Sequence, residues 1–85
     1  MKRDYSNELK IFLDGYSSSH KLDFSFSCQK KQNQYFIQSK NNKTNEITVE
    51  IIDDYDVNNL VEKSDNDAKE EICSVVFKTG PKKTL

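Results

Sequence analysis

The stretch LDFSFSC spans residues 22–28 and alternates apolar with polar side chains along its whole length. The apolar positions are Leu22, Phe24, Phe26 and Cys28, and the polar positions between them are Asp23, Ser25 and Ser27. A period of two is typical of a β-strand that buries only one of its faces. The sequence therefore predicts a strand here, and the neighbouring segments are interpreted relative to it.

An amphipathic helix is predicted before this strand. Its apolar side chains recur at helical spacing and are Tyr5, Leu9, Phe12, Leu13 and Tyr16. Asp4 can cap the start of the helix, and Gly15 marks its end. We expect the apolar stripe of this helix to pack on a sheet.

Two further strands are predicted after residues 22–28. Residues 34–39 form one of them, and residues 46–53 form the other, each following a polar turn. In residues 46–53 the side chains expected to face the core are Ile47, Val49 and Ile51. This alternation is typical of antiparallel hairpins with one buried face.

The last strand is predicted from the most continuously apolar run of the chain, residues 72–78. Before it, Val57, Leu60 and Val61 favour a short helix or a loop. The predicted fold is α+β, with an N-terminal helix packed on one face of a four-stranded, mainly antiparallel sheet. The expected order is helix, three strands, short helix or loop, strand, and the order of strands within the sheet stays open. Residues 1–85 are expected to form one domain, with residues 79–85 as a frayed tail.

The core is expected to lie between the helix and the sheet. Its predicted members are Tyr5, Leu9, Phe12, Leu13, Phe24, Phe26, Tyr35, Ile37, Ile47, Val49, Ile51, Val75 and Phe77. The same alternation leaves Phe36, Ile52, Ile72 and Val76 on the opposite face of the sheet. This apolar patch is interpreted either as an interface or as a surface that the short helix or the acidic loop covers.

Acidic residues are concentrated late in the chain. The formal net charge is only −1, yet residues 50–71 hold nine of the fourteen Asp and Glu residues and two lysines, a local charge of −7. Local fields of this kind steer partners more than net charge does. The acids predicted to form a binding surface are Asp53, Asp54, Asp56, Glu62, Asp65, Asp67 and Glu70. Phe36, Ile52 and Val76 are predicted to add apolar burial at this contact or at a homodimer interface.

A calcium loop is the alternative interpretation of residues 54–65. Asp54, Asp56 and Asn58 stand at the alternating spacing of an EF-hand loop, which this stretch resembles over twelve residues. Asn59 stands where glycine is expected, Asp65 replaces the usual glutamate, and a strand precedes the segment instead of a helix. These departures favour a solvated acidic loop, and no metal or cofactor is predicted.

An enzyme is not predicted. The chain lacks a Gly-rich phosphate loop, a Cys/His set with metal-ligand spacing and paired catalytic carboxylates. His20 follows three serines, but adjacent residues on a turn do not form a positioned nucleophile and base. Cys28 and Cys73 are interpreted as small buried hydrophobes. No apolar stretch is long enough to span a membrane, and the chain start lacks a signal peptide, so a cytoplasmic protein is expected.

The predicted function is a non-catalytic protein-interaction domain. We expect a small phage or mobile-element inhibitor whose acidic segment binds a basic surface of a nucleic-acid-handling protein, or else an immunity protein for a nuclease toxin. The other alternative is a module that binds single-stranded nucleic acid. It would stack bases on Tyr35 and Phe36 beside the hairpin lysines Lys30, Lys31, Lys40 and Lys43. Acidic repulsion of phosphates makes this alternative the weaker of the two.

Overall fold

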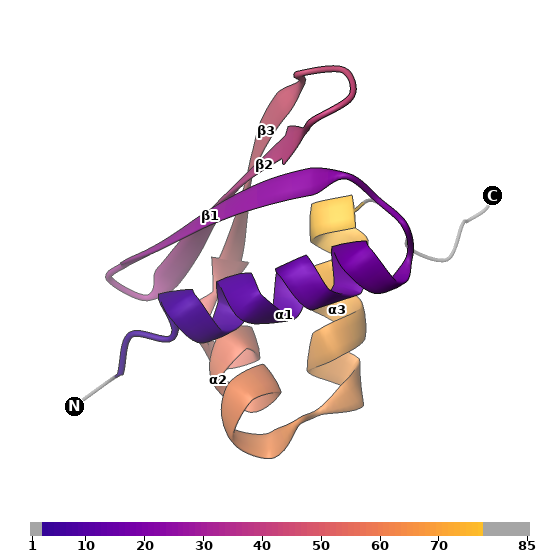
Figure 1. Ribbon diagram of the computed structural model, residues 1–85. Coiled ribbons are helices and arrows are strands. Elements are labelled where there is room, and N and C mark those ends of the chain that lie inside the picture. The colour runs from indigo at the N-terminus through magenta and orange to yellow at the C-terminus, as the bar shows by residue number, and fades with distance from the viewer. Residues whose placement is uncertain (1–2, 78–85) are drawn as a thin grey trace, which may run out of the picture.

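The computed structural model describes residues 3–77, which form three helices and three strands (Figure 1). In chain order these elements are α1 (Ser6–Ser19), β1 (Phe24–Lys31), β2 (Gln34–Asn41), β3 (Ile47–Asp53), α2 (Asp54–Lys63) and α3 (Asn66–Phe77). The α+β class and the N-terminal helix are confirmed, and the segment after the third strand, expected to be a short helix or a loop, contains the helix α2. Lys78 and the expected tail, residues 79–85, lie outside the described residues.

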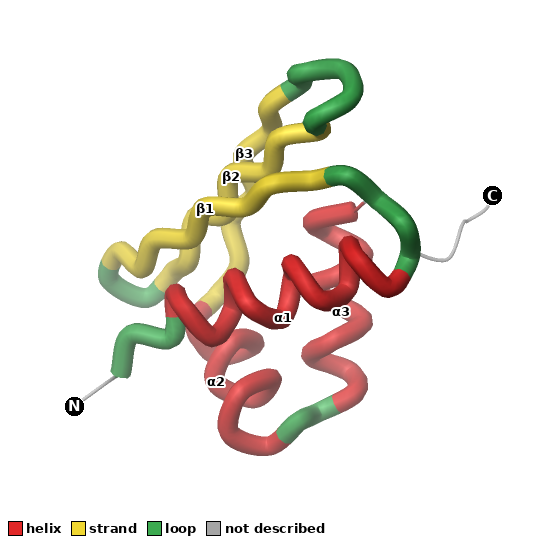
Figure 2. Tube along the Cα trace, viewed as in Figure 1, coloured by secondary structure: helices red, strands yellow, loops and turns green. Residues whose placement is uncertain are grey.

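The sheet is an antiparallel meander. Within residues 3–77 its strand order is β1-β2-β3, so each strand lies beside its neighbour in the chain. Phe26 lies opposite Ser39 in the first pair, and Tyr35 lies opposite Ile52 in the second. The helices lie together on one side of the sheet (Figure 2). We call the other side, which no described helix covers, the open face.

The predicted fourth strand is wrong, because residues 72–77 belong to α3. Ala68, Ile72 and Val76 recur every four residues and are buried, which is the spacing of one helical face. A short apolar run cannot be assigned to a strand or a buried helix by its composition alone. The helical phase of this run places Ile72 and Val76 in the core, whereas the strand prediction placed both on the opposite face of the sheet.

The predicted orientation of the third strand is also wrong. Ile47, Val49 and Ile51 lie on the open face and are 54%, 55% and 50% exposed, whereas Ile52 is buried. The register sets Ile52 opposite the buried Tyr35, and Ile51 opposite Phe36 on the open face. Since side chains alternate with a period of two, this register turns Ile47, Val49 and Ile51 outward and Ile52 inward.

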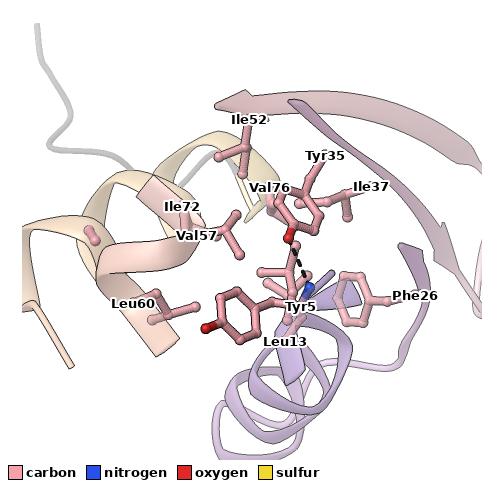
Figure 3. Packing of buried hydrophobic residues seen from close by; sticks show 12 residues of the cluster. Tyr5, Leu13, Phe26, Tyr35, Ile37, Ile52, Val57, Leu60, Ile72 and Val76 are labelled. Atoms are coloured by element: carbon pink, nitrogen blue, oxygen red, sulfur yellow. Dashed lines mark hydrogen bonds between the residues drawn. The ribbon is translucent and has the colours of Figure 1, made fainter. Parts of the chain in front are cut away.

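The core fills the space between the helices and the inner face of the sheet (Figure 3). Its buried members are Tyr5, Leu9, Leu13, Phe26, Tyr35, Ile37, Ile52, Val57, Leu60, Ala68, Ile72 and Val76. The Tyr35 hydroxyl accepts a hydrogen bond from the backbone N–H of Tyr5 at 2.9 Å, which ties the start of α1 to the middle strand. Phe24 and Phe26 pack edge-on against Phe77, and this contact joins β1 to the end of α3.

Candidate functional site

The acidic segment is folded into a helical hairpin made of α2 and α3. Ser64 ends α2 in the left-handed conformation, with φ 50°, and its N–H completes the last turn by donating to the Asn59 carbonyl. Asp65 then caps α3, because its Oδ1 accepts a hydrogen bond from the N–H of Asp67 at 2.9 Å. A turn of two residues thus fixes how the two acidic helices face each other.

An open depression lies between the two helices. It is lined by Tyr55, Asp56, Asn59, Asp65, Asp67, Ala68 and Glu71. Four of these side chains are carboxylates, and they come from both helices and the turn between them. Tyr55, which also lines the depression, is 70% exposed, so an amphipathic aromatic ring lies next to these carboxylates. Such an arrangement can bind a cationic side chain by charge and by its ring face.

The electrostatics of this depression show crowding of like charges. Partial burial raises the pKa of Asp56 above its usual range, and the nearby carboxylates of Glu71 and Asp53 raise it further. Ionisation of Asp56 therefore costs free energy in the folded chain. A positive group brought close to Asp56 would relieve that cost, because an opposite charge favours the ionised form.

The structure places the predicted acidic residues in different environments. Asp53, Glu62, Asp67 and Glu70 are exposed, and Asp56 and Asp65 are half-buried. Asp54 is buried at 7% exposure, which corrects its place in the predicted binding surface. Glu62 accepts a hydrogen bond from the Tyr5 hydroxyl, so it links α2 to the chain start. Only Asp56, Asp65 and Asp67 of the predicted set meet at the depression.

The predicted apolar part of the binding surface is not assembled. Ile52 and Val76 are buried in the core, because β3 turns Ile52 inward and α3 turns Val76 toward the sheet. Phe36 alone lies on the open face, where the ammonium group of Lys31 lies 5.3 Å from its ring centroid. These three side chains therefore do not form one contact surface in this fold.

The calcium-loop interpretation of residues 54–65 is contradicted by the local structure. Asp54, Asp56 and Asn58 lie in α2, and Asp65 follows its end. A calcium loop must instead wrap its oxygen ligands around the cation. Across residues 3–77, no three His, Cys, Asp or Glu side chains are grouped in a way that could hold a metal ion.

The histidine and the cysteines have structural surroundings. His20 stacks on Tyr16 with ring centroids 4.0 Å apart, and its Nδ1 lies 3.0 Å from the Tyr16 carbonyl oxygen, as an N–H donor at the end of α1 would. Burial raises the pKa of the Cys28 and Cys73 thiols to about 11, so both thiols stay protonated at neutral pH. Protonated thiols are poor nucleophiles.

One of the two aromatic residues required by the nucleic-acid interpretation is inaccessible to a base. Tyr35 is completely buried, so its ring cannot stack on a base. Phe36 is half-buried, and the ammonium group of Lys31 lies over its ring. The open face therefore does not present the paired aromatics that this alternative requires.

Tyr55 and Glu71 line the depression but were not selected from the sequence as contact residues. Glu71 was grouped with the acidic segment without a role, and Tyr55 was not considered as a contact residue. The available signal was the helical spacing of the segment, because Tyr55 and Asn59 are four residues apart on α2. With the segment interpreted as a helix, one face would have carried an aromatic ring beside the acids.

Asp65 gives a first test of the hairpin. Replacing Asp65 with alanine is expected to lower the free energy of unfolding by about 1 kcal/mol, because the cap of α3 is lost. Asp65→Asn keeps an oxygen that accepts the Asp67 N–H and is expected to stay near wild type. Urea unfolding followed by circular dichroism measures both variants. Equal losses in the two variants would show that charge, not capping, is the role of this side chain.

The fold and the site together define a small α+β domain. It is a three-stranded antiparallel meander covered on one face by helices, of which α2 and α3 form the acidic hairpin. No protein-family model, curated protein or solved structure matches this chain. Among the described helices, none has the length and apolarity needed to cross a membrane.

Proposed function

We propose that the protein is a non-catalytic protein-interaction domain whose α2–α3 hairpin binds a basic surface of a partner. The observation that carries this proposal is the depression lined by Asp56, Asp67 and Glu71 together with the exposed Tyr55. Clustered charge speeds the encounter with a partner of opposite sign, and a large aromatic ring is typical of the residues that dominate binding energy.

The partner class follows from the chemistry of the depression. Carboxylates around an aromatic ring suit arginine and lysine side chains, which proteins that handle nucleic acids display in their binding grooves. The proposed role is therefore inhibition, with the acidic hairpin occupying a groove that otherwise holds phosphates. A phage-type inhibitor and an immunity protein for a nuclease toxin would both act in this way.

A triple variant tests the charge component. Asp56→Asn, Asp67→Asn and Glu71→Gln together remove the carboxylates of the depression and leave the Asp65 cap in place. Immobilised wild-type chain is used to capture proteins from a lysate of its source, and each captured protein is purified for kinetics. The triple variant is expected to associate about tenfold more slowly at low salt, with the difference shrinking as salt rises.

The matched control removes the same number of charges elsewhere. The control variant carries Glu8→Gln and Asp14→Asn on α1 and Glu46→Gln in the turn before β3, and none of these residues lines the depression. This control is expected to associate at the wild-type rate. Tyr55→Ala, which keeps every charge, is expected to speed dissociation by tenfold or more, because a truncated central aromatic costs about 2 kcal/mol of binding. An unchanged association rate in the triple variant would refute the proposal.

A further inference from the structure

The outer edge of β3 exposes backbone groups with a defined spacing. The Asn41 N–H donates to the Glu46 carbonyl, and the Asp54 N–H donates to the Asn33 carbonyl, so both are hydrogen-bonded pairs of the β2–β3 register. Hydrogen-bonded and non-hydrogen-bonded pairs alternate along an antiparallel ladder. The N–H and C=O groups of Ile47, Val49 and Ile51 therefore point away from β2, toward the free edge.

Among residues 3–77, this edge has only part of the usual protection against pairing, because Glu50, on the inner face, is the one charged side chain in Ile47–Ile52. Within Ile47–Ile52 there is no proline, no lysine and no bulge, and the residues pointing to the open face are β-branched and half exposed. The opposite edge of the sheet differs, because α1 packs along β1 (Figure 1) and β1 ends in Lys30 and Lys31. Monomeric proteins normally blunt an edge such as that of β3.

We propose that β3 pairs with β3 of a second copy of the chain, antiparallel and centred on Val49. Each of Ile47, Val49 and Ile51 would then exchange backbone hydrogen bonds with the partner strand, Val49 with its own copy and Ile47 with Ile51. The two sheets would join into one continuous sheet about a two-fold axis, an isologous interface in which each copy contributes the same strand. This inference does not depend on the function proposed for the acidic hairpin.

The sequence of β3 selects this register over its neighbours. Centring on Val49 sets β-branched side chains opposite one another on the open face and sets Thr48 opposite Glu50 on the inner face. Centring on Glu50 would place this carboxylate opposite its own copy and Ile47 opposite Asp53. Centring on Thr48 would place Glu46 opposite Glu50. Like charges directly opposite in a sheet are destabilising, so only the Val49-centred pairing is self-complementary.

The position of the apolar stripe favours edge pairing over packing of two open faces. Ile47, Val49 and Ile51 all lie on the edge strand, whereas the β1 side of the open face carries Ser25, Ser27, Gln29 and Lys31. Two open faces packed together would bury these polar side chains. An edge-to-edge contact places apolar residues beside apolar residues and leaves the polar ones in water.

A pair of lysine substitutions tests the edge. The full-length chain is studied by analytical ultracentrifugation across a concentration series, and a dimer is the expected wild-type result. Val49→Lys is expected to raise the dimer dissociation constant about tenfold or more, because two ammonium groups would lie opposite each other at the centre of the new ladder. Gln38→Lys adds the same charge to the open face directly beside Val49, but on β2. It is expected to leave the dimer unchanged.

Cysteine crosslinking tests the register. Residues of a hydrogen-bonded antiparallel pair have Cα atoms about 5.5 Å apart, which a disulfide spans, so Val49→Cys is expected to form a covalent dimer under mild oxidation. In the same dimer the two copies of residue 38 are separated by about 14 Å across three strand spacings, so Gln38→Cys is expected to form no covalent crosslink. The dimer fraction is measured on a non-reducing gel after unfolding.

Each contrary result overturns the inference. A wild-type chain that is monomeric across the concentration series refutes pairing. A dimer that persists in Val49→Lys places the contact elsewhere. Crosslinking of Gln38→Cys in preference to Val49→Cys would show that the open faces pack on each other. The circular dichroism spectra of Val49→Lys and Gln38→Lys, both at surface positions, are expected to match that of the wild type.

Discussion

Replacing Ile72 with alanine is expected to lower the free energy of unfolding by about 2–5 kcal/mol. Ile72 is completely buried on the face of α3 that meets the core, between Ala68 and Val76. The truncation removes buried apolar surface and leaves a cavity that the surrounding helices and sheet only partly close. Because small domains have about 5–15 kcal/mol of stability in total, this single change is expected to remove a large part of it.

Val75→Ala is the matched control for Ile72→Ala. Val75 is only partly buried, so its truncation is expected to cost about 1 kcal/mol. Urea unfolding measures both variants, since a domain of this size is expected to unfold in one cooperative transition. The comparison also tests the secondary structure, because a strand over residues 72–78 would bury Val75 and expose Ile72. A larger loss for Val75→Ala than for Ile72→Ala would contradict the helix.

The first half of the fold could be predicted because each of its apolar patterns fits only one type of secondary structure and only one buried face. In residues 24–28 every apolar side chain falls on one face, so the inward direction of Phe24, Phe26 and Cys28 is unambiguous. The apolar stripe of α1 likewise fits a helix and no strand. Tyr35 and Ile37 were correctly placed inward, since Gln34 and Gln38 flank them on the other face.

The second half could not be predicted because its patterns fit two structures. In β3 the pair Ile51 and Ile52 places an apolar side chain on each face, and only the register with β2 decides which of them is buried. The run ICSVVF is apolar at both strand and helix spacing. Its helical state depends on the Asp65 cap and on packing of Ile72 against the core, and both are properties of the folded chain.

The candidate site shows the same division. The concentration of acids was readable from composition, but the orientation of each acid depends on the phase of α2 and α3. That phase buries Asp54, brings Asp56 close to Glu71 and leaves Tyr55 in water. The prediction left this segment open as a short helix or a loop, and without a definite helical phase these orientations could not be inferred.

Replacing Tyr35 with phenylalanine is expected to lower the free energy of unfolding by about 1–3 kcal/mol at neutral pH. The hydroxyl is removed while the ring stays, so the loss is not due to a cavity. In the wild type this hydroxyl accepts the N–H of Tyr5 at 2.9 Å and points its own hydrogen toward the carbonyl oxygen of Arg3 at 3.4 Å. Without it, a backbone donor at a buried position has no partner, and that costs more than the hydrogen bond contributed.

Tyr55→Phe is the matched control for Tyr35→Phe, because it removes the same atom from a ring that is 70% exposed. Its effect on the free energy of unfolding is expected to stay within about 0.5 kcal/mol. Equal losses in the two variants would exclude the buried hydrogen bond as the cause.

Alkaline pH provides an independent measurement of the same group. Burial raises the pKa of Tyr35 above its ordinary value, so the folded chain keeps this proton at a pH where the unfolded chain releases it. Above pH of about 10, the unfolded state therefore binds fewer protons, and the free energy of unfolding must fall as the pH rises. In Tyr35→Phe this component is absent, so stability is expected to fall less steeply than in the wild type by up to about 1.4 kcal/mol per pH unit. Parallel pH dependences in urea unfolding would show that Tyr35 ionises alike in both states, which its complete burial and its two backbone partners oppose.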